Sequence, residues 1–172
     1  GGTYTSEAGD VSYNDADANS TISGGNLISN AGNVTVTAKG GLTVDTIQAV
    51  KEAKIKSDGE GEAILTNVTA GTIDINAAGS VHSNSLTSTA GDVIINAGKD
   101  IFVAAASAKQ KATLVSGNDL TITGSLTTEE EAKLESGHDM KLEKVEVGAL
   151  EATTKGTGSI TGTTLTSKTG DM

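Results

Sequence analysis

The sequence predicts an all-β protein with the architecture of a right-handed parallel β-helix, also called a β-solenoid. Three observations support this prediction. One apolar pattern returns about every twenty residues, each return contains three short apolar segments separated by turns that often contain glycine, and the chain has no proline. A repeat of this length is typical of one solenoid coil, because stacked coils bury a face that no coil buries alone. We expect about eight coils of 19–20 residues, each with three short strands.

The first apolar segment of each coil gives the clearest period. Its members follow one another in steps of 19 to 20 residues, which keeps the register from coil to coil. Apolar and polar residues alternate within it, as in Val34-Thr35-Val36, and this alternation is typical of a half-buried strand. The predicted first column is Val34, Ala53, Ile73, Val93, Ala112, Ala132 and Ala152.

Two further columns complete each coil. The second consists of Leu42, Ala63, Val81, Ile101, Leu120, Met140 and Ile160, and the third of Ile47, Val68, Leu86, Ala106, Leu126, Val145 and Leu165. Turn glycines precede the strands, as Gly91, Gly117 and Gly137 do, and we expect them to supply positive φ angles. Because the chain always circles the same way, the strands are parallel, and the crossover rule makes the helix right-handed.

We interpret residues 1–172 as a single β-helix segment. Residues 1–31 form an irregular first coil with a small insertion, since Gly9 and Gly32 open successive coils 23 residues apart, and residues 32–172 form the regular coils. The chain starts without methionine and stops at Gly170-Asp171-Met172, just inside a motif that opens coils. We therefore expect a fragment of a longer repetitive protein.

Composition excludes several classes of function. The formal net charge is −10 and every basic residue except the two histidines is lysine, which argues against nucleic acid as a partner, since such proteins cluster basic residues and favour arginine. Without cysteine there is no disulfide framework and no thiolate zinc site. The longest apolar run, 101–106, is too short to span a bilayer, so we expect no membrane insertion by this segment.

The units that open the coils resemble filamentous haemagglutinin repeats. The matching units are Ala8-Gly9-Asp10-Val11, Ala31-Gly32-Asn33-Val34, Ala90-Gly91-Asp92-Val93 and Ser116-Gly117-Asn118-Asp119-Leu120. Such repeats build the shafts of two-partner-secreted adhesins and of contact-dependent growth inhibition effectors. The resemblance implies a secreted rod on a Gram-negative cell surface, an outer-membrane partner transporter, and a host-cell or bacterial surface receptor. The family's secretion domain carries Asn-Pro motifs, and the absence of proline here indicates a shaft segment instead.

Parallel β-helices also include polysaccharide lyases and hydrolases, which use clustered carboxylates. Asp100, Asp119 and Asp139 recur near the coil period beside glycine turns, as Asp92 does, but Ser159 follows them in the next coil. We interpret these aspartates, with Asp74, as turn residues that bond local turn amides, so we expect no enzyme, no catalytic residue and no cofactor.

A metal site is also not expected. His82 points outward from a strand and His138 lies in a turn three coils later, too far away to share an ion. The turn at 58–62 and the run at 129–131 are acidic, but neither has the glycine-rich repeat of calcium-binding β-rolls. We interpret both as solvated turns.

The outward residues of the third segment form a candidate contact face of small polar side chains. Its residues are Thr46, Asn67, Thr69, Ser85, Thr87, Ser125, Thr127 and Thr166. Such a face suits contact with a glycan or a protein, and it is also the ordinary solvent face of a β-helix. Two functions follow: a structural and adhesive shaft that holds a distal binding or toxin region away from the cell, or a carbohydrate-binding or carbohydrate-active β-helix.

Overall fold

The computed structural model describes residues 2–18 and 20–169, in which every strand pairing is parallel and no helix occurs. The strands form a ten-stranded and an eight-stranded sheet. The ten-stranded sheet contains β1 (Thr3–Ser6), β3 (Ile22–Ser23), β4 (Asn26–Ser29), β6 (Leu42–Ala49), β8 (Ala63–Ala70), β10 (Val81–Ser88), β12 (Ile101–Ala108), β14 (Leu120–Thr128), β16 (Met140–Val147) and β18 (Ile160–Ser167). The eight-stranded sheet contains β2 (Val11–Asp15), β5 (Val34–Ala38), β7 (Glu52–Ser57), β9 (Thr72–Ala77), β11 (Val93–Ala97), β13 (Ala112–Ser116), β15 (Glu131–Ser136) and β17 (Ala149–Thr154).

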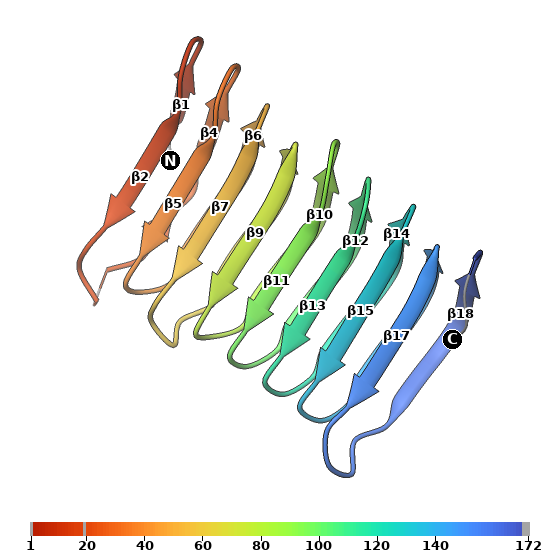
Figure 1. Ribbon diagram of the computed structural model, residues 1–172. Helices are drawn as coiled ribbons and strands as arrows, with labels where there is room; N and C mark the ends of the chain where they lie inside the picture. Colours follow the sequence, from red (N-terminus) through yellow and green to blue (C-terminus); the bar gives the residue numbers. More distant parts are fainter. Residues whose placement is uncertain (1, 19, 170–172) are drawn as a thin grey trace.

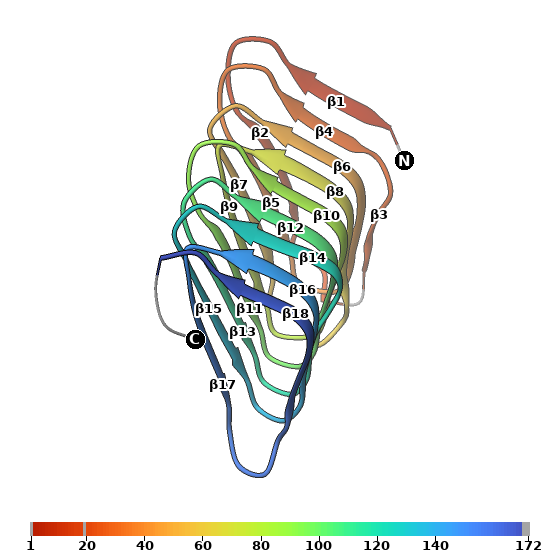
Figure 2. The same ribbon diagram turned by 90° about the vertical axis from the view of Figure 1, so that its right-hand side faces the viewer.

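The coils stack into a straight rod with the chain ends at opposite ends of it (Figure 1). Each strand inside the stack pairs with the strands one coil before and one coil after it, as β11 does with β9 and β13. Seen from the C-terminal end, the chain circles anticlockwise as it advances toward the viewer, so the helix is right-handed (Figure 2). The parallel β-helix predicted from the sequence is confirmed.

The three apolar segments of a coil occupy two strands, because the second and third lie in one long, bent strand. In β6, Leu42 and Val44 face inward, Asp45 and Thr46 both face outward, and Ile47 is buried again. Two successive outward residues reverse the alternation, so the strand turns a corner and presents two outer faces. The coil therefore has three faces but two sheets.

The interior is filled by columns of aliphatic side chains that match the predicted columns. In the first column, every residue from Val34 to Ala132 is at most 1% exposed, and in the second the same holds from Leu42 to Met140. Register places each residue beside its counterpart one coil away, as Ile75, Ile95 and Leu114 show. Burial of this apolar area drives folding, and the small aliphatics fill the narrow interior between the sheets without aromatic residues.

The last coil corrects one predicted position. Ala132 pairs with Leu150, and Ala152 pairs instead with Leu134, so the first column ends at Leu150 and the predicted Ala152 is wrong by two residues. The cause is a turn that consists of Gly148 alone between β16 and β17. A Cβ atom at Gly148 would lie 2.5 Å from the Glu130 carbonyl oxygen, which explains why the short turn uses glycine.

The first described coil is longer than the others. Val11 pairs with Val34, a step of 23 residues, and the additional residues lie between β2 and β3. Leu27 is buried in this coil, whereas Ile28 faces outward and is half-buried. The predicted end motif Gly170-Asp171-Met172 lies outside the described residues.

The turn glycines are required for close approach between coils, and the predicted positive φ is wrong for them. Only Gly24, Gly25 and Gly156 have positive φ among the described residues. At Gly117 a Cβ atom would lie 2.1 Å from the Gly98 carbonyl oxygen, and at Gly137 1.7 Å from that of Gly117. Neighbouring coils are about 4.8 Å apart at these turns, which leaves no room for a side chain that points along the rod.

Replacing Ile95 by aspartate tests the interior assignment. Ile95 is 0% exposed between Ile75 and Leu114, so the variant buries an unpaired carboxylate and loses about 3–5 kcal/mol of unfolding free energy. The measurement is chemical unfolding followed by circular dichroism. Ile94→Asp is the matched control, because Ile94 faces outward on the same strand, and its loss should stay below about 1 kcal/mol. Equal losses for the two variants would contradict the orientation of β11.

Replacing Gly117 by alanine tests the close approach of the turns. The added methyl group overlaps the Gly98 carbonyl oxygen, so the coils must separate locally and the unfolding free energy falls by about 1–3 kcal/mol. Gly9→Ala is the control, since a Cβ atom there meets only the Ser6 hydroxyl at 3.7 Å. The same unfolding measurement compares them, and an unchanged midpoint for Gly117→Ala would show that steric overlap does not explain this glycine.

Candidate functional site

The structure brings all eight residues of the candidate contact face onto one side of the ten-stranded sheet. They lie on the third face, in two neighbouring rows that run along the rod. In the first row, Thr46 pairs with Asn67, which in turn pairs with Ser85. In the second row, Thr69 is followed by Thr87, Ser107 and Thr127. Ser125 continues the first row and Thr166 the second. All eight side chains are exposed or half-buried.

This face is interrupted near the C-terminal end. Lys144 follows Ser125 in the first row and Glu146 follows Thr127 in the second, and the two charged groups form an ion pair of 3.0 Å. Beside the rows lies a recess of about 430 Å³, whose lining includes Ser107, Thr127, Lys109 and Lys168. Lys109 forms an ion pair with Glu129. The face therefore offers hydroxyl groups, with the ion pairs Lys144–Glu146 and Lys109–Glu129 at its margin.

The three recurring aspartates form a ladder between coils. The Asp119 backbone N–H donates to Asp100 Oδ1 at 3.2 Å, and the Asp139 backbone N–H donates to Asp119 Oδ1 at 3.0 Å. Ser159 ends the ladder by donating to Asp139 Oδ1 from its backbone N–H at 2.8 Å and from its hydroxyl at 2.9 Å. Each aspartate thus holds the start of the equivalent strand in the next coil.

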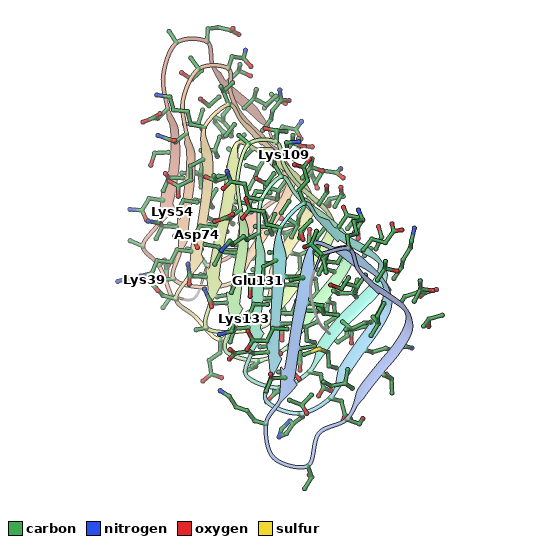
Figure 3. All side chains as sticks on the ribbon, turned by 45° about the vertical axis from the view of Figure 1, so that its right-hand side comes forward. Lys39, Lys54, Asp74, Lys109, Glu131 and Lys133 are labelled. Atoms are coloured by element: carbon green, nitrogen blue, oxygen red, sulfur yellow. The ribbon has the colours of Figure 1, made fainter. Side chains whose placement is uncertain are left out.

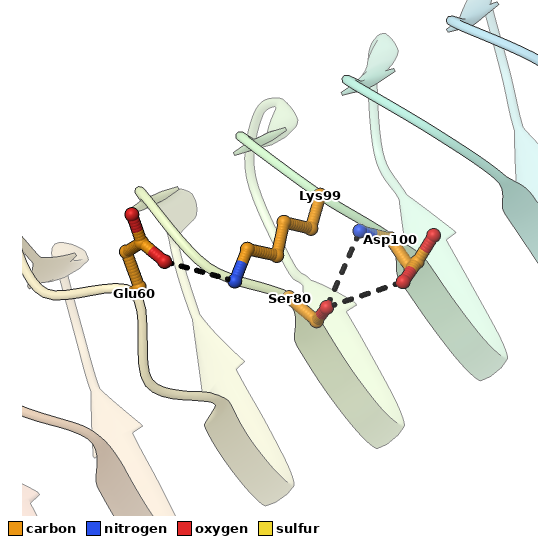
Figure 4. Close-up of polar contacts among 4 residues, drawn as sticks. All are labelled: Glu60, Ser80, Lys99 and Asp100. Atoms are coloured by element: carbon orange, nitrogen blue, oxygen red, sulfur yellow. Dashed lines mark hydrogen bonds and ion pairs between the residues drawn. The ribbon is translucent and has the colours of Figure 1, made fainter.

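The prediction that these aspartates bond local turn amides is therefore wrong for the ladder, because the amides belong to the following coil. Ser80 occupies the same position one coil before Asp100 and contacts it by two hydrogen bonds of 3.3 and 3.4 Å (Figure 4). A second ladder precedes the other sheet, where Asp92 accepts from the Lys111 backbone N–H at 3.0 Å. Asp74 lies on β9 rather than in a turn.

Hydrogen bonding affects the titration of the last carboxylate of the ladder. The Ser159 backbone N–H, followed by the Ser159 hydroxyl, lowers the pKa of Asp139 below its ordinary value of 3.8, because both donors stabilise the ionised form. A general acid near neutral pH requires the opposite shift. The ladder geometry thus suits a structural link between coils.

Neighbouring lysines pair with several carboxylates of the acidic turns. Asp58 pairs with Lys56 at 2.8 Å, and Glu60 pairs with Lys99 at 3.3 Å (Figure 4). In the 129–131 run, Glu131 lies 3.8 Å from Lys111. Charged side chains also project from the eight-stranded sheet, including Lys54 and Asp74 on adjacent strands (Figure 3). Within residues 2–18 and 20–169, no group of three or more His, Asp or Glu side chains is placed to hold a metal ion.

The two histidines lie apart, as predicted. His82 faces outward on β10, and His138 lies in the turn before β16. His82 Nε2 lies 3.8 Å from Glu62 Oε1. Its ring stacks on Phe102, with ring centroids 4.8 Å apart and an angle of 26° between the rings.

Sequence reasoning missed the apolar row that contains this stack. Ile64, His82 and Phe102 are paired on three successive coils and all face outward, with Ile64 and Phe102 each 38% exposed. Phe102 lies between Ile101 and Val103, which both face inward. The alternation of inward and outward residues along a strand could therefore have predicted that Phe102 faces outward. Sequence reasoning also missed Ser83, which is buried in the interior with a hydroxyl that has no hydrogen-bond partner.

Comparison with known proteins identifies no relative: no family model, no curated protein and no solved structure matches this chain. In the described part of the chain, no helix is long and apolar enough to cross a membrane.

Acid unfolding tests the Asp139 link. Because the pKa of Asp139 is lowered in the folded state, its ionised form stabilises the fold above pH 3.8, and this contribution disappears as the pH falls through the lowered folded value. The Asp139→Asn variant keeps an acceptor oxygen but does not titrate. When the pH is lowered from about 5 to about 2, we expect its melting temperature to fall less than that of the parent. Thermal melts at both pH values provide the measurement.

Ser159→Ala separates the two donors in the same experiment. It removes the hydroxyl but keeps the backbone N–H, so its acid sensitivity should lie between those of the parent and Asp139→Asn. Identical acid profiles for all three proteins would show that this link does not contribute to stability.

Proposed function

We propose that this chain is a structural shaft segment of a large secreted bacterial surface protein, in which it holds a distal binding or toxin region away from the cell. The observation that carries the proposal is the continuous stacking of coils: each sheet runs from strand to strand without a break, from β1 to β18 and from β2 to β17, and the two register shifts within the pairings of β14 do not interrupt the stack. Successive coils are joined by hydrogen bonds along the whole rod, so length is added coil by coil.

The polar side chains support the same proposal. The aspartates that a carbohydrate-active enzyme would use are engaged in bonds between coils, and six of the twelve lysines pair with nearby carboxylates. Under this proposal, an outer-membrane transporter exports the longer protein, and a host-cell or bacterial surface receptor binds its distal region.

A deletion that keeps the register tests the shaft proposal in the full-length protein. Val93 and Ala132 belong to the same column two coils apart, so removal of residues 93–131 joins Asp92 to Ala132 without changing the stacking. We expect a rod shorter by about 10 Å, measured by electron microscopy, with cell attachment or growth inhibition retained. A globular particle in place of a rod, or loss of activity from a correctly folded deletion, would overturn the proposal.

The control deletion removes residues 93–121, which is one and a half coils. It joins a turn to the middle of a strand of the other sheet, so the columns no longer match and the segment should not fold. Far-ultraviolet circular dichroism of the isolated chain measures this. Together, the two deletions separate the effect of length from the effect of register.

Carbohydrate binding remains the second candidate function, and one specific observation favours it. The His82–Phe102 stack is an exposed aromatic surface on a chain whose composition is only 2% aromatic. Aromatic rings that are partly exposed on a protein surface commonly take part in recognition.

A further inference from the structure

We propose that the outer face of the eight-stranded sheet binds the same face of a second copy of this chain, with the two rods antiparallel. The proposal goes beyond the proposed function and does not rest on it. Its basis is the order of charges in one outward row, which runs along the rod from β7 to β17 and which we call the charged row. Strand register places these residues in it: Lys54, Asp74, Ile94, Thr113, Lys133 and Glu151.

The charged row is complementary to itself when it is reversed. From β7 to β17 its charges are positive, negative, neutral, neutral, positive and negative. Reversing the row exchanges every charge for its opposite, so an antiparallel copy places its Glu151 over Lys54 and its Lys133 over Asp74. A two-fold axis parallel to the strands, between β11 and β13, gives this arrangement and forms each pair twice. Two parallel rods would instead place like charges over one another.

Most of these charged groups have no ionic partner in their own chain. Lys54, Asp74 and Glu151 form no ion pair within residues 2–18 and 20–169. Asp74 accepts a hydrogen bond of 2.6 Å from the neutral amide of Asn76. Lys133 pairs with Glu135 at 3.0 Å, and its side chain stays 43% exposed. Lys54, Asp74 and Lys133 project from the outer side of the same sheet (Figure 3), so a second copy can reach them.

The centre of the proposed interface is uncharged. Ile94 and Asn96 on β11 and Thr113 and Val115 on β13 are all half-buried and face outward around the two-fold axis. In the antiparallel dimer, Ile94 faces Thr113 of the second copy, and Val115 faces its Asn96. Protein interfaces are commonly depleted of charge at their centre and polar at their rim. This face has that arrangement, because its unpaired charges lie on the outer strands.

The shape of the sheet permits the contact, and its size predicts a weak dimer. The strands from β7 to β17 keep nearly the same direction along the rod (Figure 1). Face-to-face sheets lie about 10 Å apart, a gap that lysine and glutamate side chains can bridge. The strands from β7 to β17 have five or six residues each, so the face measures roughly 29 by 17 Å. This is less than the roughly 800 Å² that each partner of a stable complex buries, so we expect a reversible dimer.

The alternating signs argue against other partners for this face. A polyanion would meet Asp74 and Glu151, and a polycation would meet Lys54 and Lys133, so either would place like charges together. The candidate contact face lacks the same order, because its charges Lys144 and Glu146 pair with each other. A second copy is the occupant whose charges match the row at every position.

Sedimentation velocity of the 172-residue chain tests the proposal. In about 50 mM salt we expect a monomer–dimer equilibrium with a dissociation constant on the order of tens of micromolar. In about 1 M salt the dimer should be at least about fivefold weaker, because the Debye length falls to about 3 Å and screens the exposed pairs.

Charge exchange tests the proposed pairing. Lys54→Glu turns both Lys54–Glu151 contacts into repulsions and should weaken the dimer about tenfold. Lys54→Glu combined with Glu151→Lys brings opposite charges together again and should restore the parent affinity. Lys141→Glu is the matched control, because it changes the net charge equally but lies exposed on β16 of the other sheet, and it should leave the dimer unchanged. A thermal melt checks that each variant is folded.

Spin labels measure the orientation of the two rods. The chain has no cysteine, so Thr153→Cys provides a single attachment site on the exposed side of β17. Antiparallel rods place the two labels five strand spacings apart, roughly 25 Å, whereas parallel rods bring them within about 15 Å. Pulsed electron paramagnetic resonance measures this distance.

Several results would overturn the proposal. They are a chain that stays monomeric at about 500 µM in low salt, a Lys54→Glu variant that dimerises like the parent, a folded double variant that does not regain the dimer, and a short distance between the labels. Species larger than a dimer that persist in Lys54→Glu would also overturn it, and would assign the association to end-to-end stacking of the terminal coils.

Discussion

The hydrogen bonding of each strand to its counterpart one coil away is the constraint on which the rest of this structure depends. Pairing in register places inward side chains above inward side chains, so the interior becomes a set of columns such as Ile75, Ile95 and Leu114. The same spacing sets the turns, where coils approach too closely for a Cβ atom at Gly117 or Gly137. Column packing and glycine turns are thus two consequences of one stacking distance.

The stacking also explains how an acidic chain builds its turns. Carboxylates at equivalent positions on adjacent coils would repel one another, yet the ladder from Asp100 to Asp139 uses each carboxylate to accept the next backbone N–H. Lysines offset much of the remaining charge, as Lys99 does for Glu60 and Lys111 for Glu131. Glu62, beside the exposed Ile64–His82–Phe102 row, differs because its neighbour is His82, 3.8 Å away, and not a lysine.

Much of the fold could be predicted because the repeat makes local and long-range signals coincide. Alternation marks each strand and the period of about twenty residues pairs it, so the columns from Val34 to Ala132 were identified without coordinates. Prediction failed for two features that depend on the contact between neighbouring coils. Gly148 shortens one turn and moves the column to Leu150, and the aspartates bond the next coil instead of their own turn.

The sequence by itself determined the architecture, the period and which face of most strands is buried, because those properties depend on the spacing of apolar residues along the chain. It also placed the eight contact-face residues on one outward segment. Only the tertiary structure decided that the second and third segments share a bent strand, and that His82 stacks on Phe102 beside Glu62. These features depend on distances between coils, which residue spacing within one coil does not specify.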